Sequence, residues 1–291
     1  MDWTTLLQIT INGILTGGLY ALIAVGLALI WGLMGLVNFA HGDLLMLGMY
    51  LAFWIWSFTG IDPIVSVIIV GPFMYLVGVL IYRLITSRVL RAERYAQIFS
   101  TFGLSILLRA VAQYLWSPNF RMVTNPVLAG SINIGDIVIG RPLLVAGIVA
   151  FILAFCVYVI MRKTDLGRAL SATAEDRATA QIMGINSDRM FSIAWGISGM
   201  CVGVAGSLMA SYMFIFPDVG IMFSMLSPAI VALGGFGSIP GTVIAAFLVG
   251  VVQNNASFYL MPALKFGVVY VIYIIVVVAR PSGLMGEVKT K

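Results

Sequence analysis

The residues best suited to chemistry in this sequence are Asn38, His41 and Asp43, which stand close together between two apolar runs. His41 is the only histidine, and no second His, Cys or Glu lies near it to complete a metal-ligand set, so we expect no metal site. Gly35 and Gly42 flank the group, which indicates that a helix is interrupted here. Two interpretations are open: a hydrogen-bonded group that holds the break, or part of a pathway or gate.

A second polar group, Thr101, Ser105 and Arg109, recurs every four residues within an apolar run. In a helix this spacing gives a polar stripe along one face, and we take these residues as further pathway or gate candidates. Arg109 has two options. Its side chain can extend toward the nearer helix end, where water is accessible, or it can face the protein interior.

The sequence lacks the motifs of common enzyme active sites. It contains no GxxxxGK[ST] nucleotide loop, no GxSxG elbow and no HExxH pair. A single histidine leaves little room for acid–base catalysis, so we predict that the chain is not an enzyme and holds no cofactor itself. Cys156 and Cys201 both fall in apolar runs, where we expect buried packing residues rather than a disulfide.

The composition is that of a membrane protein. Hydrophobic residues make up 61% of the 291 residues and charged residues only 9%, against about 25% in soluble domains. Because one transmembrane helix needs roughly 20 residues, the chain has room for about eight, and we treat residues 1–291 as a single all-α integral membrane domain. We expect spans at residues 6–31, 44–58, 63–86, 96–116, 143–161, 190–212, 242–260 and 266–279.

Most of the sixteen Lys and Arg residues lie in three regions: 83–94, 162–189 and 280–291. Because loops rich in Lys and Arg stay in the cytoplasm, we expect these regions inside, the N-terminus outside and the C-terminus inside. The net charge of +5 then orients the protein and does not indicate nucleic-acid binding. The loop at 117–141 would lie outside, and its alternating pattern predicts a short hairpin.

One predicted span, residues 190–212, carries small residues on a single face, where they let neighbouring helices approach closely. We expect close helix packing along this face, which could also line a pathway. The glycines of this face are Gly196, Gly199, Gly203 and Gly206.

A short apolar run at residues 224–233 is too short to cross a bilayer as a helix. A cluster of glycine and proline follows it and cannot continue a regular helix. We therefore predict a re-entrant half-span that turns back after this run. The residues of the predicted turn are Gly234, Gly235, Gly237 and Pro240.

The longest polar interruption is residues 162–189. Residues 173–183 are rich in helix-forming side chains and Gly184 follows them, so we predict a short amphipathic helix that ends there. A connector between two spans could be far shorter, so we interpret the segment as a docking element, with a solvated connector as the alternative. The docking candidates are Ala174, Glu175, Asp176, Ala178, Ala180, Ile182 and Gly184.

Four motifs carry a family resemblance. They are GLMGLVNFAHGDLLMLGMY at 32–50, DLGRALSATAEDRATAQIMGINSDR at 165–189, LGGFGSIPGT at 233–242 and RPSGLMGE at 280–287. In their order and spacing, over about residues 6–286, the chain resembles the permease subunits of high-affinity branched-chain amino acid ABC importers. The NFAHG motif and the short chain favour the first of the two permease types in such systems.

The resemblance implies an inner-membrane permease, embedded in lipid, that works by alternating access. It implies as partners a homologous second permease, two cytoplasmic ATPase subunits that would bind ATP and Mg²⁺, and a periplasmic solute-binding protein. It also implies that the segment from Ala174 to Gly184 docks on an ATPase. Sister systems with the same motifs import urea, short amides and other small solutes. A stand-alone secondary carrier that works through Asp43 and Arg109 is the alternative from another class.

Overall fold

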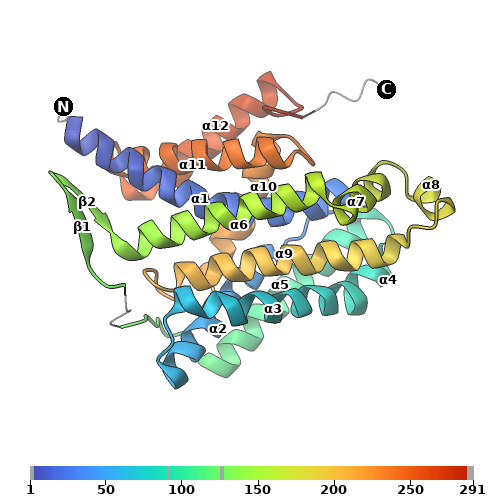
Figure 1. Ribbon diagram of the computed structural model, residues 1–291, viewed down its shortest axis with the longest axis horizontal. Coiled ribbons are helices and arrows are strands. Elements are labelled where there is room, and N and C mark those ends of the chain that lie inside the picture. The colour runs from blue at the N-terminus through green and yellow to red at the C-terminus, as the bar shows by residue number, and fades with distance from the viewer. Residues whose placement is uncertain (1–2, 91, 125–127, 287–291) are drawn as a thin grey trace.

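The computed structural model describes residues 3–90, 92–124 and 128–286, and nearly all of its regular structure is helical (Figure 1). Eight helices of this described part are long and apolar enough to cross a membrane, which confirms the predicted all-α membrane fold. The elements are α1 Trp3–Met34, α2 His41–Thr59, α3 Pro63–Ile81, the π-helix η1 Tyr82–Thr86, α4 Ser87–Val89, α5 Arg94–Trp116, β1 Ser131–Ile134, β2 Ile137–Gly140, α6 Arg141–Lys163, α7 Asp165–Glu175, α8 Arg177–Ile182, α9 Ser187–Met209, α10 Val219–Gly234, α11 Ile239–Tyr259, the 3₁₀ turn η2 Pro262–Leu264 and α12 Lys265–Ala279.

Helices α1 and α9 form the centre of the molecule. α1 packs against α11 and α6, and α9 packs against α3 and α2. The glycine face of α9 makes these contacts close: a Cβ at Gly199 would lie 2.5 Å from the carbonyl oxygen of Met74, and one at Gly196 would lie 2.5 Å from the ring of Tyr75. Such contacts bring helix backbones together where lipid provides no hydrophobic drive between helices.

The two cysteines occupy different environments. Cys201 is buried in α9, whereas Cys156 lies exposed on the outer face of α6. The expectation of a buried residue was therefore wrong for Cys156. An apolar run alone does not tell which face of a membrane helix points toward lipid.

The predicted hairpin forms just before α6. Strands β1 and β2 are antiparallel and pair Ser131 with Gly140 and Ile134 with Ile137. The segment before them is tied down separately, because the backbone of Arg121 pairs with that of Ile215, between α9 and α10. We call this end of the molecule the hairpin end.

The polar segment contains two helices rather than one. The continuous helix predicted over residues 173–183 is wrong, because Asp176 adopts an extended conformation and separates α7 from α8. Its carboxylate accepts hydrogen bonds from the backbone N–H groups of Ala178 and Thr179, so it caps α8 instead of continuing α7. Gly184 has a φ of 86° and follows α8 as predicted.

The predicted half-span corresponds to α10, which begins at Val219, earlier than expected, and ends at Gly234. Its 16 residues extend roughly 24 Å, short of a bilayer core of about 30 Å. Gly235 and Gly237 take positive φ values of 104° and 80° in the turn that follows. Two of the predicted turn residues belong to the flanking helices: Gly234 is the last residue of α10, and Pro240 lies in the first turn of α11, where proline is well suited.

Candidate functional site

The break predicted near His41 lies deep inside the molecule. Helix α1 ends at Met34, and the chain then runs back without helical structure until α2 begins at His41. The Nε2 atom of His41 lies 2.9 Å from the carbonyl oxygen of Ile23. Ile23 precedes the end of α1 by roughly 16 Å, so α2 starts beside the middle of α1. Non-helical backbone at this depth has to be buried in protein or to line a cavity.

Two helix N-termini meet at the break. The backbone N–H of Gly42, in the first turn of α2, donates to Ser224 Oγ of α10 over 3.1 Å. A Cβ at Gly220 would lie 2.5 Å from the carbonyl oxygen of Gly42. The starts of α2 and α10 are thus in backbone contact, so both discontinuous helices begin at one place, as in transporters with broken helices.

Helix α5 adds its polar stripe to the same place. Arg109 Nε lies 3.3 Å from Asp43 Oδ1, and Arg109 Nη2 donates to Ser105 Oγ over 3.1 Å. Thr101 Oγ1 donates to the carbonyl oxygen of Val37, a peptide group of the break, over 3.3 Å. Arg109 therefore faces the protein rather than the helix end, and its ion pair neutralises a carboxylate that is 0% exposed. All six pathway or gate candidates lie in this cluster, which we call the break cluster.

The break cluster is not fully hydrogen-bonded. Asn38 Oδ1 accepts from the backbone N–H of Ala40, but Asn38 Nδ2 and His41 Nδ1 are buried without a hydrogen-bond partner among the described residues. Unpaired buried polar atoms are rare because each one costs free energy. Sequence reasoning found the side chains of this cluster but missed Ser224 and the carbonyl groups of Ile23 and Val37, which no motif marks.

The docking candidates lie at the opposite end from the hairpin, on α7, α8 and the turn after them (Figure 1). Ile182 is 85% exposed and the neighbouring Met183 is 77% exposed, although the segment around them is polar. Ala174, Glu175 and Ala178 are exposed as well, whereas Ala180 is buried. Ile182 and Met183 together form a small apolar tip on this polar segment.

The turn after α10 lies at this same end. Phe236 and Ser238 line a pocket of about 480 Å³ together with Arg162 of α6 and Ser171 of α7. Phe236 also packs against Trp31, with ring centroids 4.5 Å apart and the rings tilted by 36°. The end of α1, the turn and the polar segment are therefore neighbours.

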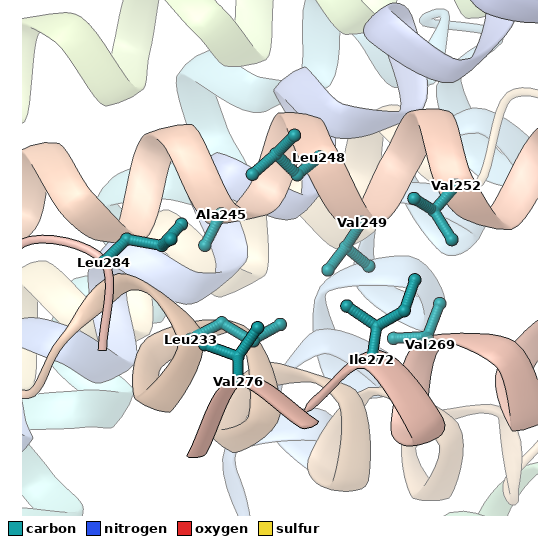
Figure 2. Close-up of a pocket in the computed structure, with 9 residues that line it drawn as sticks. All are labelled: Leu233, Ala245, Leu248, Val249, Val252, Val269, Ile272, Val276 and Leu284. Carbon is teal, nitrogen blue, oxygen red and sulfur yellow. The ribbon is translucent and has the colours of Figure 1, made fainter. Parts of the chain in front are cut away.

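A different cavity lies between α10, α11 and α12 (Figure 2). Its volume is about 60 Å³, and every residue that lines it is apolar, including Leu233, Val249 and Val276. A cavity of this kind stays dry and has no group that could orient a polar solute. We interpret it as a packing defect between α12 and its neighbours α10 and α11.

Residues 9–278 match the family model described as the permease component of branched-chain amino acid transport systems. The high-affinity branched-chain amino acid transport system permease protein LivH of Escherichia coli (strain K12) is 32% identical over 97% of this chain and 96% of its own length. The corresponding protein BraD of Pseudomonas aeruginosa is 28% identical over 97% of this chain and 96% of its own.

One solved structure is also similar in shape. PsaBC from Streptococcus pneumoniae in complex with Fab aligns with a TM-score of 0.48 and 13% identity, over 91% of this chain and 89% of that chain. A likeness at this level assigns no function to the present protein. The family model and the relatives assign the family: the chain belongs to the family of permease components of branched-chain amino acid transport systems.

Proposed function

We propose that this chain is one of two homologous permeases in an ABC importer of the bacterial inner membrane, and that it forms part of the pathway for branched-chain amino acids. Two separate ATPase subunits would bind ATP and Mg²⁺, and a periplasmic binding protein would deliver the solute. Family membership supports the permease role, and the substrates named for LivH and BraD support the solute class.

The apolar tip of Ile182 and Met183 carries the proposal of an ATPase partner. Both side chains are mostly exposed in a segment that is otherwise polar, so their exposure has a cost that contact with a protein would remove. We place this end of the molecule in the cytoplasm because the basic residues of the described part concentrate there, on α4, on α7 and at the end of α6. Arg91, Lys289 and Lys291, which we also assigned to this side, lie outside the described residues, as do Met1 and Asp2 of the N-terminus.

A mechanical connection runs from this tip into the centre of the molecule. The guanidinium of Arg177, in α8, lies 5.3 Å from the ring centroid of Phe191 in α9. Asp188, in the first turn of α9, accepts a 2.6 Å hydrogen bond from Tyr82, the first residue of η1, which continues α3. A force applied to α8 would therefore reach α9 and α3, which pack closely together. Alternating access would follow if the two permeases rock when the ATPases close.

The break cluster would lie on the pathway under this proposal. Its unpaired Asn38 and His41 atoms can offer hydrogen bonds to a passing solute or to water. The Asp43 oxygens also lack a hydrogen-bond partner among the described residues, but the ion pair with Arg109 balances the carboxylate charge, so Asp43 is poorly suited to bind a coupling ion. This pairing favours a permease driven by ATP over a stand-alone ion-coupled carrier.

The test is coexpression with the ATPase subunits, the second permease and the binding protein in cells that lack leucine uptake. The double variant Ile182→Asp/Met183→Asp should lose copurification of the ATPases and leucine uptake together, because both changes place charge on the apolar tip. Gln181→Glu, an exposed polar neighbour in the same helix, is the matched control and should behave like the original chain. Full uptake by the double variant would refute the docking assignment. Uptake of urea or acetamide in place of leucine would refute the solute class.

A further inference from the structure

A third pocket, distinct from the break cluster, opens among α1, α9, α10 and α11 near the start of α12. Its volume is about 310 Å³, at the lower end of the roughly 300–1,000 Å³ of small-molecule sites. Leu143, just past strand β2, belongs to the lining, so the pocket lies toward the hairpin end (Figure 1). Under the proposed orientation this is the side from which solute arrives.

The polar lining is suited to a carboxylate and to a hydrogen-bond donor. Lys265 supplies a cation that forms no ion pair with any described residue, and no Asp or Glu is among the lining residues. Gln253 is only 5% exposed, and its Oε1 atom has no hydrogen-bond partner within the described part of the chain. A buried amide oxygen without a donor costs free energy, which a ligand with N–H groups would recover.

One side of the remaining wall is apolar, and the hydroxyl and amide groups of Thr16, Tyr20, Tyr212, Asn254 and Ser257 complete the lining. The apolar side includes Met209, Met213, Met222 and Phe223. Met209 and Phe223 are almost fully buried and fixed by packing, whereas Met213 and Met222 are partly exposed and can adjust. Thioether side chains fit irregular aliphatic groups because they are flexible and polarisable. The lining thus combines a cation, a hydrogen-bond acceptor and an aliphatic wall in one small space.

We infer that this pocket binds a small aliphatic amino acid as a zwitterion, with its carboxylate toward Lys265, its ammonium group toward Gln253 Oε1 and its side chain against the methionines. The inference deepens the proposed function and rests on it for the solute class. It adds a holding site in the permease itself, separate from the binding protein. A zwitterion satisfies the lysine and the orphan amide oxygen together, which neither an amine nor a fatty acid does.

Protection from alkylation tests the inference without relying on transport. Ser257 lines the pocket, whereas Asn255, two residues earlier on the same helix, does not. Ser257→Cys and the control Asn255→Cys would each be made in a Cys156→Ser background, because Cys156 is exposed and Cys201 is buried. The chain would be labelled with N-ethylmaleimide in phosphatidylcholine nanodiscs, with and without leucine.

Leucine at roughly ten times its Kd should slow labelling of Cys at 257 about tenfold, since only the unoccupied fraction reacts, and should leave the control unchanged. Leucinamide and 4-methylpentanoate should protect much less, because each lacks one charge. Lys265→Met should raise the leucine concentration needed for protection by roughly tenfold, since a charge-assisted hydrogen bond is lost.

No protection by leucine, or equal protection by all three probes, would overturn the inference. If anionic lipid in the nanodisc protected the cysteine and leucine did not, the inference would also be overturned, because the pocket would then hold a lipid headgroup. Leucine uptake by the intact complex separates this result from the proposed function. Uptake without protection overturns the pocket alone, and protection without uptake overturns the permease role alone.

Discussion

Helices α9 and α5 are of equal length and both cross the membrane, yet they are held in opposite ways. Within an 18-residue apolar stretch of each helix, 89% of the residues of α9 are buried inside the molecule, compared with 22% of those of α5. Gly199 of α9 lies against the backbone of α3, whereas Gly103 of α5 has no heavy atom near the place of a Cβ. α9 is fixed by packing along its length. α5 is attached chiefly by its polar stripe.

This difference in packing suggests that α9 is part of a rigid framework and that α5 is a movable wall. Close backbone packing is difficult to rearrange, because a core has few alternative arrangements of equal density. An ion pair and a few hydrogen bonds can be exchanged for others or for water. We therefore expect α9 to transmit motion and α5 to respond to it, with the break cluster between them.

The largest effect should come from adding bulk to the framework. Gly199→Val would drive its side chain into the backbone of Met74 and Gly78 of α3, so the variant should fail to accumulate in the membrane, a loss well above the roughly 1–3 kcal/mol typical of overpacking. The control is Gly103→Val on α5, which meets open space and should be neutral. The measurement is thermal stability of the purified proteins by fluorescence size exclusion. Equal loss in both variants would contradict the division into framework and wall.

Breaking the polar attachment of α5 should come next. Arg109→Met leaves Asp43 buried and unpaired, at a cost of up to about 3–5 kcal/mol, whereas Asp43→Asn leaves an arginine that is 22% exposed and should cost less. The double variant should recover most of the stability, because no uncompensated charge remains. A double-mutant cycle on thermal stability measures the coupling. Additive effects would show that the ion pair does not hold α5.

A medium effect is expected at the joint between the docking segment and α9. Gly184 has a positive φ, which costs a residue with a Cβ about 1–2 kcal/mol, so Gly184→Glu should distort the joint and uncouple transport. Gly184→Asn tolerates this conformation and should keep most activity. Leucine uptake, normalised to the amount of chain in the membrane, reports the outcome. Full uptake by Gly184→Glu would mean that the joint transmits nothing.

Filling the cavity beneath α12 should have a small stabilising effect. Val249→Ile adds one methylene toward a cavity of about 60 Å³ and should gain up to about 0.8 kcal/mol, which raises Tm by a few degrees. Val278→Ile adds the same group at a side chain that is 79% exposed and serves as control. A lower Tm for Val249→Ile would indicate that the cavity between α10, α11 and α12 cannot accept even one methylene.

The smallest effect concerns the cap of α8. Hydrogen bonds from the Thr179 hydroxyl and from the backbone N–H groups of Thr179 and Ala178 lower the pKa of Asp176. A lowered pKa means that the cap is fully formed above the ordinary pKa of about 3.9 and is lost as pH falls through the lowered value. A spin label at Ile182→Cys, in the Cys156→Ser background, should therefore become more mobile only at pH below about 4. With Asp176→Asn that pH dependence should disappear.

Sequence reasoning succeeded where the signal is local. The span number, the break before His41, the hairpin and the turn after Gly234 were all predicted, because hydropathy and glycine act over a few residues. It failed at Asp176, where a side chain that caps the next helix outweighed the helix propensity of its neighbours. It also misjudged Cys156, since burial depends on which helix lies beside it.

The sequence by itself determined that this protein is a helical membrane permease, because composition, span length and motifs are properties of consecutive residues. Only the tertiary structure decided that Arg109 pairs with Asp43, that α2 and α10 begin at one point, and that Lys265 and Gln253 share a pocket. The physical reason is that the position of a residue along an apolar run says how deep it lies in the membrane. Which helices become neighbours depends on contacts such as that of Gly42 with Ser224, 182 residues apart in the chain.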